Sequence, residues 1–585
     1  MMRNRNSLGS ALLAYSVLTL TACQEQEPPT TLPSDDGDSG GSGSGSGSGG
    51  AEQSAGTPDP SPLSRLTTEQ YKNTVLDLFP GVEMPSLLFP PQLEAEGGFE
   101  NNATFNSASG PLVDAYNRAA IAVSEEVTFD LGCNLGDDAC AHGYIAQLSE
   151  RTWRRPIEPS ELETLIADYD RWAASHGADT AMRLTIQSLL QSPDFIYFPR
   201  FGEAMSEGAS ASVPLSSWEM ASRLSYFLWN TMPDDELFTL AREDGLRERD
   251  VVIAQAWRML SEQRARTAAI NLHRQLFDLD EQGAIDFEYY APQIGGDSDF
   301  YYLEYLPEVR YEPDVFVMQH IFEGEGTLAA LLTSNRAWVT ANTAELAYGV
   351  EVPADAPSVR YVAPDEPLVD FEGLGVWQRD YYEVELNPAQ RAGLFTLAGF
   401  LSSKSNPRDP SPVKRGVMLL ERLQCVHLSP PGDVPPIEEI EDAMPRTNRD
   451  KYIMHSEAPA CVGCHQQIDG LGFTFENYDS LGAWRDTDNG YPVDASGALV
   501  GTDNDGPVNN AVEMMDRLAQ SRTIHDCYVR QLFRHSFGRN EDVVVDGPTL
   551  EFLQEGFWQS GGDIPELLVN IAASYEFRHR EVFQP

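Results

Sequence analysis

A Cys-x-x-Cys-His string in the last quarter of the chain has the most specific chemistry in this sequence. It consists of Cys461, Cys464 and His465, in a chain of 585 residues that contains seven cysteines. Two thiols one helical turn apart can add to the two vinyl groups of a haem, and the adjacent histidine can then bind the iron. Thioredoxin-like redox sites and structural zinc sites use similar cysteine spacings.

Two of these three interpretations lack the surroundings that they need. A thioredoxin-like site requires a strand-to-helix turn in a β-α-β setting, and no such alternation surrounds the string. A structural zinc site requires a second pair of ligands, and the nearest candidates, His455 and Cys425, do not form one. The sequence therefore favours one covalently attached c-type haem, with Cys461 and Cys464 as thioether donors and His465 as an iron ligand.

The N-terminus predicts export, which is the setting in which c-type haem is assembled. Arg3 and Arg5 precede an apolar stretch at 11–20 that is too short for a membrane span. The sequence Leu-Thr-Ala-Cys at 20–23 resembles the lipobox of bacterial lipoproteins, with Cys23 as the lipidated residue; an ordinary signal peptide is the alternative. By resemblance to Gram-negative sorting, Gln24 and Glu25 favour the outer membrane. We expect an exported outer-membrane lipoprotein, facing the periplasm or the surface and held by a lipid anchor alone.

The composition of the chain limits the classes of molecule that it can bind. The formal net charge of −50 would repel a nucleic acid over most of the surface, so we expect no nucleic-acid partner. Residues 24–61 are rich in Pro, Thr, Asp, Gly and Ser, which is typical of a flexible spacer. The folded part is expected to begin near Pro62.

The elements that must position the string are mostly helices. Capping boxes are predicted at Thr67 and Gln70 and at Ser216 and Glu219, and Ser160 is a further expected cap. The predicted fold class is mainly α: a multidomain helical protein with a C-terminal cytochrome-c-like helical haem module and few short strands. We divide the chain into a signal peptide (1–22), a lipid anchor with a flexible linker (23–61), three helical domains (62–130, 131–205 and 206–350), an irregular Pro-rich connector in which short strands could form (351–384), a c-type haem domain (385–490) and a C-terminal helical domain (491–585).

The other cysteines are expected to pair, because cysteines of exported proteins are usually bonded or committed to a cofactor. Cys133 and Cys140 lie seven residues apart in a turn-rich stretch, where a structural disulfide is the simplest interpretation. If Cys461 and Cys464 are used together, Cys425 and Cys527 remain as a second pair. That bond would join the last two segments of the chain.

The residues around the string resemble a known family. The chain is similar to large exported bacterial proteins made of consecutive domains of unknown function with a C-terminal cytochrome-c-like module. The motif positions that carry this resemblance are His455, Cys461, Cys464, His465, Ile468-Asp469, Gly472-Phe473, Glu476-Asn477-Tyr478-Asp479, Gly482 and Arg485. Gly470 replaces the usual Pro and should loosen a turn there. The resemblance extends over nearly the whole folded chain and implies one haem.

His465 is the expected proximal ligand, and a backbone carbonyl could orient its other ring nitrogen. The resemblance makes His455 the first candidate for the distal ligand, although it could instead donate a hydrogen bond from outside the coordination sphere. Met454, Met514 and Met515 are alternatives, but an apolar helix stripe accounts for the last two. His525 and His535 are expected at the surface or at an interface. Arg485 could bind a haem propionate, or could pair with Asp479 or Glu476.

An Asp-rich loop follows the string, at 486–505. Its Asp-x-Asp-x-Gly pattern suggests calcium, but Gly497 stands where the bidentate acid of a calcium loop is expected, so turn formation is the favoured interpretation. The sequence contains no nucleophile elbow, P-loop or His-Glu-x-x-His motif. Two functions therefore stay open. One is single-electron transfer to a redox partner protein of the envelope, or haem-dependent oxidoreductase chemistry. The other is an envelope binding or scaffold lipoprotein whose haem is structural.

Overall fold

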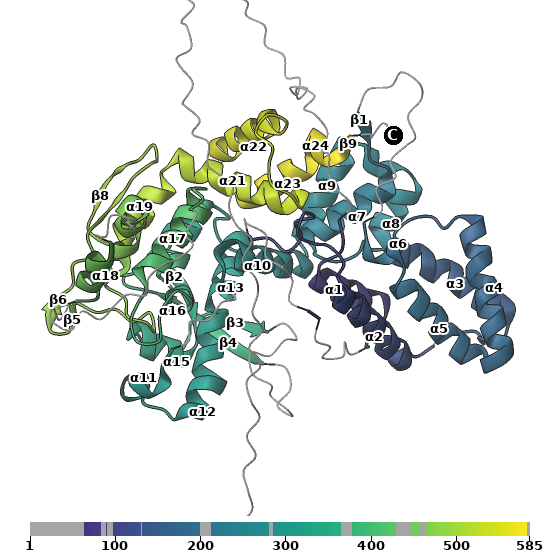
Figure 1. The fold of residues 1–585 in the computed structure, drawn as a ribbon, viewed down its shortest axis with the longest axis horizontal. Coiled ribbons are helices and arrows are strands. Elements are labelled where there is room, and N and C mark those ends of the chain that lie inside the picture. The colour runs from purple at the N-terminus through teal and green to yellow at the C-terminus, as the bar shows by residue number, and fades with distance from the viewer. Residues whose placement is uncertain are drawn as a thin grey trace, which may run out of the picture. The chain divides into compact units, whose positions relative to one another are not determined.

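The computed structural model describes residues 64–82, 89–90, 98–129, 131–198, 212–279, 285–363, 377–428, 447–456 and 462–581, with the side chains of 212, 454–456 and 581 excluded. The fold is mainly α, as predicted, with a few short strands between the helices (Figure 1). None of the helices in these ranges is long and apolar enough to cross a membrane. The proposed signal peptide, the lipidated Cys23 and the linker lie outside the described residues.

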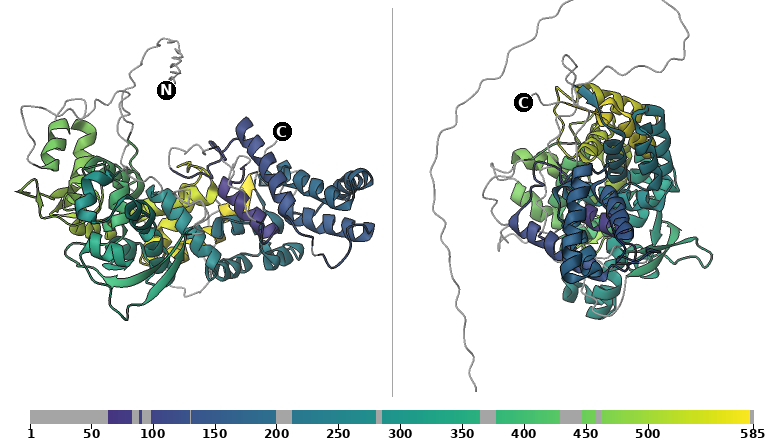
Figure 2. Two further views of the ribbon diagram at one scale, coloured as in Figure 1. Left: turned by 90° about the horizontal axis from the view of Figure 1, so that it is seen from below. Right: turned by 90° about the vertical axis from the view of Figure 1, so that its right-hand side faces the viewer.

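The N-terminal helices form a bundle with its own hydrophobic core. They are α1 (Thr68–Leu78), α2 (Gly110–Glu126), α3 (Asp138–Trp153), α4 (Pro159–His176), α5 (Ala178–Leu190) and α6 (Pro193–Ile196). Helix α5 packs against both α2 and α4, as the purple and blue ribbons of Figure 2 show. Tyr71, Tyr116 and Phe195 pack together in this core with ring centroids 4.7 to 5.3 Å apart.

Two of the three predicted helix caps are confirmed. Thr67 and Gln70 exchange backbone-to-side-chain hydrogen bonds of 3.1 Å at the start of α1, and Ser216 and Glu219 form the same box at the start of α7 (Ser217–Leu228). The prediction for Ser160 is wrong. Helix α4 begins two residues earlier, with Glu158 as the cap and Pro159 at the first helical position, where proline loses no hydrogen bond.

The central elements run from β1 to β4. They are β1 (Ser212–Pro214), α7 (Ser217–Leu228), α8 (Asp235–Arg242), η1 (Gly245–Arg247), α9 (Arg249–Leu260), α10 (Gln263–Phe277), α11 (Phe287–Ile294), α12 (Ser298–Phe300), η2 (Tyr301–Tyr305), α13 (Leu306–Phe322), α14 (Leu328–Thr333), β2 (Arg336–Val339), α15 (Ala341–Thr343), η3 (Ala344–Tyr348), β3 (Ser358–Val362) and β4 (Gln378–Glu385).

The expected irregular connector contains regular structure in its described part. Strand β4 is the centre of a three-stranded antiparallel sheet and pairs with β2 on one side and β3 on the other. Tyr381 on β4 is fully buried, and Tyr361 on β3 packs with Tyr311 of α13 at a ring distance of 5.5 Å. The packing of aromatic side chains from β3 and β4 on α13 thus fixes how these strands pair, which the Pro-rich composition of the segment did not indicate.

The last third of the chain holds the Cys-x-x-Cys-His helix and the C-terminal helices. Its elements are η4 (Leu394–Thr396), α16 (Ala398–Ser403), α17 (Pro412–Leu423), α18 (Asn448–Ser456), α19 (Val462–Gly472), η5 (Phe473–Phe475), β5 (Thr487–Asp488), β6 (Tyr491–Pro492), β7 (Gly497–Leu499), β8 (Gly506–Val508), α20 (Ala511–Ala519), α21 (Arg522–Phe537), α22 (Gly547–Gln559), α23 (Ile564–Ala573), α24 (Tyr575–Arg578) and β9 (His579–Glu581).

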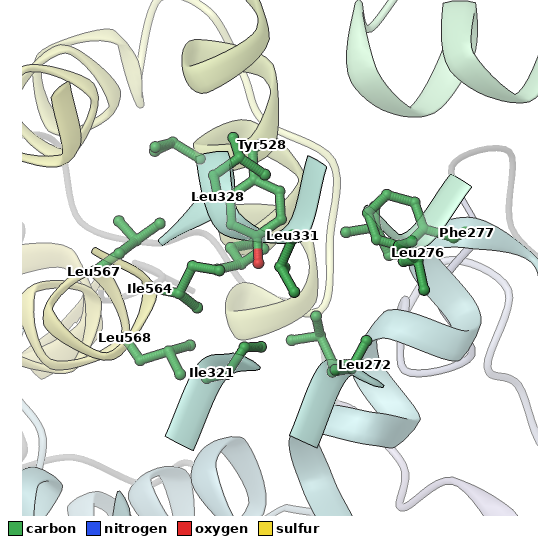
Figure 3. Packing of buried hydrophobic residues seen from close by; sticks show 14 of the residues in the cluster. Leu272, Leu276, Phe277, Ile321, Leu328, Leu331, Tyr528, Ile564, Leu567 and Leu568 are labelled. Atoms are coloured by element: carbon green, nitrogen blue, oxygen red, sulfur yellow. The ribbon is translucent and has the colours of Figure 1, made fainter. Parts of the chain in front are cut away.

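One hydrophobic core joins the central segment to both later segments. Figure 3 shows Leu272 and Ile321 from α10 and α13 packed with Ile564 and Leu568 from α23. The same cluster includes Leu471 of α19. The backbone adds to this link, because β1 pairs antiparallel with β9 near the end of the chain. Side chains far apart in sequence therefore share one apolar interior from α7 onward.

The structure places both predicted cysteine pairs at disulfide-bonding distance. Cys133 and Cys140, just before and within the first turn of α3, have their sulfur atoms 1.92 Å apart. Cys425, after α17, and Cys527 on α21 have theirs 1.98 Å apart and are separated by 102 residues in sequence. The second bond encloses all of α18, α19 and α20 in one covalent loop.

Candidate functional site

Helix α19 carries the described part of the Cys-x-x-Cys-His string. Val462 and Gly463 at its start are exposed, whereas Cys464 is half-buried and packs against the large hydrophobic core. Cys464 is the cysteine that stays outside a disulfide among the described residues. Cys461 lies just before the helix, outside the described residues. The thiol of Cys464 is thus available for chemistry at the edge of a packed helix.

His465 is oriented by an acid on its own helix. Its Nδ1 atom lies 2.9 Å from Oδ1 of Asp469, and the two side chains are 12% and 15% exposed. Residues four apart face each other on a helix, so the backbone of α19 itself sets this contact. A carboxylate acceptor on Nδ1 fixes the tautomer in which Nε2 carries the lone pair that a metal would bind. Sequence reasoning expected a backbone carbonyl in this position, although the spacing of His465 and Asp469 could have indicated the carboxylate.

Helices α17 and α19 touch through glycines. A Cβ atom added to Gly416 of α17 would lie 2.4 Å from the carbonyl oxygen of Ile468, and one added to Gly472 would lie 2.0 Å from that of Pro412. Both obstacles are backbone atoms, which cannot rotate away as a side chain can. The two glycines thus allow α19, the helix that carries His465, to pack closely against α17.

We expect Gly472→Ala to destabilise the protein and Gly463→Ala to leave it intact. The methyl group at 472 collides with Pro412, and overpacking of this kind costs about 1–3 kcal/mol. Apart from chain neighbours and the backbone of its own helix, no atom of the described residues lies within 4 Å of a Cβ built at Gly463, and alanine exceeds glycine in helix preference by up to about 1 kcal/mol. Urea unfolding followed by circular dichroism measures the free energy of unfolding of both variants. Equal free energies of unfolding in the two variants would show that the α17 contact does not matter.

The expectation of a loosened turn at Gly470 is wrong. Residue 470 lies inside α19, and a Cβ there would stand 2.9 Å from the carbonyl oxygen of Ala498. Strand β7 approaches from the other side, since a Cβ on Gly497 would lie 2.2 Å from the carbonyl oxygen of Gly470. The glycine therefore permits a close helix-to-strand contact.

The loop after α19 is tied down by a buried arginine. Arg415 of α17 is 1% exposed and donates to the carbonyl oxygens of Phe475, Tyr478 and Asp479 at 3.2 to 3.3 Å. Its other contacts are the carbonyl of Leu401 at 2.9 Å and the hydroxyl of Ser405 at 3.1 Å. Burial lowers the pKa of Arg415 to about 10, which leaves it charged at neutral pH. Sequence reasoning missed this residue because carbonyl acceptors leave no residue-type signal.

Arg485 makes the structural pairing that the sequence allowed. Its Nη2 lies 3.2 Å from Oε2 of Glu476, and its Nη1 lies 3.0 Å from Oδ1 of Asp488. Glu476 is 2% exposed, and burial raises its pKa to about 7 against the lowering effect of Arg485. The second expected partner, Asp479, instead accepts backbone hydrogen bonds from Leu481 and Ala483. Through these ion pairs, Arg485 stabilises the loop after α19.

Five family models match consecutive stretches of the chain. Their descriptions are protein of unknown function DUF1587 (64–128), DUF1595 (140–199), DUF1592 (215–350), DUF1588 (391–488) and DUF1585 (505–577). The chain is a series of five domains of unknown function. Its Cys461, Cys464 and His465 lie in the DUF1588 domain, and the DUF1588 and DUF1585 families are usually associated with cytochrome c-like proteins. No curated protein and no solved structure gives a significant match.

The candidates for a distal ligand divide between the DUF1588 and DUF1585 domains. His455 and Met454 lie on α18 of the DUF1588 domain, but their side chains lie outside the described residues. Met514 and Met515 on α20 of the DUF1585 domain are fully buried in the shared core, as expected of an apolar stripe.

The two C-terminal histidines differ in their surroundings. The expectation of a surface or interface position is wrong for His525, which is 4% exposed and whose ring lies nearly perpendicular to that of Trp558, with the two centroids 4.9 Å apart. His535 does lie at an interface, because its ring contacts Phe99 of the DUF1587 segment at 5.2 Å. Burial lowers the pKa of His535 to about 4, so its ring is neutral at neutral pH.

The acids of the loop at 486–505 make hydrogen bonds within turns and at a helix start. Asp503 accepts from the backbone nitrogens of Arg522 and Thr523, at 2.9 and 3.1 Å, at the start of α21. Asp505 accepts from the nitrogen of Thr502 at 2.8 Å, and Asp494 from that of Ser496 at 3.0 Å. These bonds fit the turn-forming role that the sequence favoured over calcium binding.

Proposed function

We propose that this chain is a lipid-anchored c-type haem protein of the cell envelope that transfers single electrons to or from a partner protein. The observation that carries the proposal is the geometry on α19. Cys464 stays outside a disulfide while the other four described cysteines are paired, and His465 next to it is held by Asp469. The lipobox-like sequence at 20–23 supports export and anchoring.

The residues of the string fit covalent haem. Cys461 and Cys464 would form the two thioether bonds, and His465 would bind the iron through Nε2. Haem c, when bound, supplies one-electron iron chemistry. Asp469 would keep the imidazole in one tautomer and raise its basicity. Arg415 and the glycines of α17 and α19 would hold the helix in place during electron transfer. The ion pairs of Arg485 argue against a role for it in binding a propionate.

We expect the purified full chain, expressed with c-type maturation machinery, to keep haem after denaturation. A haem stain of a denaturing gel and the absorption spectrum of the reduced protein measure this. Cys461→Ser/Cys464→Ser should lose all covalent haem. Cys133→Ser/Cys140→Ser is the matched control and should retain it, because that pair lies just before and within the first turn of α3 and is not part of the string.

Two results would contradict the proposal in different ways. A parent protein without covalent haem after maturation would exclude haem attachment at the string. A Cys461→Ser/Cys464→Ser variant that keeps full biological activity would instead favour a binding or scaffold lipoprotein whose haem is structural.

A further inference from the structure

A small cavity lies at the junction of three domains, and none of its lining residues belongs to the Cys-x-x-Cys-His helix. Its walls come from Arg65 and Asn101 in the DUF1587 segment, from α7 in the DUF1592 segment and from the end of α21 in the DUF1585 segment. The cavity volume is about 70 Å³, whereas a cavity of about 150 Å³ holds one benzene molecule. There is therefore room for an ion of roughly three to four non-hydrogen atoms.

Arg65 brings a buried positive charge to this cavity. It is 3% exposed, and its Nη1 donates to the backbone oxygen of Leu66 at 2.8 Å and to the hydroxyl of Tyr116. Its Nη2 donates to the amide oxygen of Asn106, and its Nε has no acceptor in the described part of the chain. All of these acceptors are uncharged. A buried charge is costly unless an opposite charge accompanies it, so Arg65 calls for an anion.

A second buried guanidinium lies behind the same wall. Arg154 is 1% exposed, and its Nη1 lies 3.4 Å from the hydroxyl of Tyr226, which lines the cavity. Its other acceptors are backbone oxygens, among them that of Tyr197, which forms a backbone bridge with Arg65. The Nε of Arg154 also lacks an acceptor among the described residues. Two positive charges with uncharged acceptors therefore lie on one side of the cavity.

The acid in the lining does not balance these charges. Glu219 accepts hydrogen bonds from the backbone nitrogen and the hydroxyl of Ser216, and its Oε1 lies 3.9 Å from Arg580. It therefore has partners of its own. Arg65 and Arg223 are the basic residues of the lining, so two guanidinium groups stand against one carboxylate. The formal charge of the lining is positive.

Three uncharged residues of the lining have a buried polar atom without a partner in the described part of the chain. These atoms are Oγ of Ser222, Nδ1 of His535 and Oδ1 of Asn101. The hydroxyl of Ser222 can donate to an anion, and so can the neutral ring of His535 when its proton is on Nδ1. The amide oxygen of Asn101 is an acceptor and suits a hydroxyl or a water molecule beside the ion.

We propose that this cavity binds a small carboxylate of the size of formate, acetate or bicarbonate, with Arg65 as its opposite charge and Ser222 as a hydrogen-bond donor. The planar guanidinium matches the planar carboxylate in shape and charge. The cavity volume excludes larger anions such as citrate. A carboxylate bound here would contact residues of three domains and should stabilise their junction. The proposal is independent of haem attachment.

Calorimetric titration of the full chain in Tris buffer with sodium formate, acetate and bicarbonate tests the proposal. At least one of them should bind with one-to-one stoichiometry and a dissociation constant on the order of 1 mM or tighter. The same salt should raise the melting temperature, because a ligand of the native state stabilises that state. Sodium chloride at the same ionic strength is the control titration, and phosphate and citrate test the limits of shape and size.

Three variants identify the site. Arg65→Gln should abolish binding because the positive charge is lost, and Ser222→Ala should weaken it about tenfold because one donor to an anion is lost. Ser222→Ala keeps the test valid if Arg65→Gln does not fold. Ser225→Ala is the control on the same helix: its hydroxyl donates to the carbonyl of Ser222 and does not line the cavity, so binding should be unchanged.

Three results would overturn the proposal. The first is that none of the three carboxylates binds or raises the melting temperature beyond the effect of sodium chloride. The second is binding that Ser222→Ala leaves as tight as in the parent protein. The third is tighter binding of phosphate or citrate than of any of the three, which would show that the site does not select a small planar anion.

Discussion

Replacement of Arg415 by leucine is expected to lower the free energy of unfolding by about 3–5 kcal/mol, because several buried carbonyl groups lose their donor together. Arg415 is 1% exposed and bonds to five acceptors, three of them in the loop after α19. Leucine fills only part of the space of the arginine and donates nothing to the carbonyls of Phe475 and Tyr478, which belong to buried residues. Urea unfolding followed by circular dichroism gives the size of the loss.

Lysine and a surface arginine are the matched comparisons. Arg415→Lys keeps the charge but replaces the planar fork by one ammonium group, so it should recover part of the loss. Arg360→Leu removes a guanidinium that is 52% exposed and pairs with Asp380, for which we expect about 0–1 kcal/mol. An Arg415→Leu variant as stable as Arg360→Leu would show that the loop does not depend on these bonds.

Local signals in the sequence predicted the helices well. The capping boxes at Thr67 and Ser216 depend on residues three apart, so the sequence alone is enough to find them. The same approach failed at Ser160, because Pro159 sets the start of α4, where the side chain of Glu161 accepts a hydrogen bond of 2.9 Å from the backbone nitrogen of Glu158. Helix type was therefore easier to predict than the exact first residue.

Long-range packing was beyond local reasoning. Strand β4 is ordered by β2 and β3, and its burial comes from aromatic residues of α13, which lie far from it in sequence. The segment therefore looked irregular when its own composition was considered. The shared core of α10, α13 and α23 has the same origin, because the apolar residues of α10 and α13 pack on those of α23, which lies far along the chain from both.

In the candidate site too, some residues could be predicted from the sequence and others could not. The string at 461–465 was recognisable because haem attachment depends on spacing along one helical turn. The support of His465 by Asp469 could have been predicted from the same periodicity. Arg415 could not, because its partners are backbone oxygens.

Loss of the Cys425–Cys527 disulfide is expected to have the largest effect on stability. A cross-link that closes a loop of about 100 residues lowers the entropy of the unfolded chain by an amount worth about 4.7 kcal/mol. This bond spans 102 residues, and the loop it closes contains α18, α19 and α20. Cys425→Ala/Cys527→Ala should therefore lower the free energy of unfolding by several kcal/mol, as measured by urea unfolding of haem-free protein.

The Cys133–Cys140 bond provides the internal comparison. Its sequence separation is 7, for which the same entropy argument gives about 2.5 kcal/mol. Cys133→Ala/Cys140→Ala should thus cost about half as much as the longer cross-link. Cys527 is 3% exposed, so its replacement also removes packing, and reduction of the parent protein separates the two contributions because it breaks the bond without deleting a side chain. If the reduced parent protein is as stable as the oxidised one, the loop closed around α19 is held by its packing on α17 and by Arg415 alone.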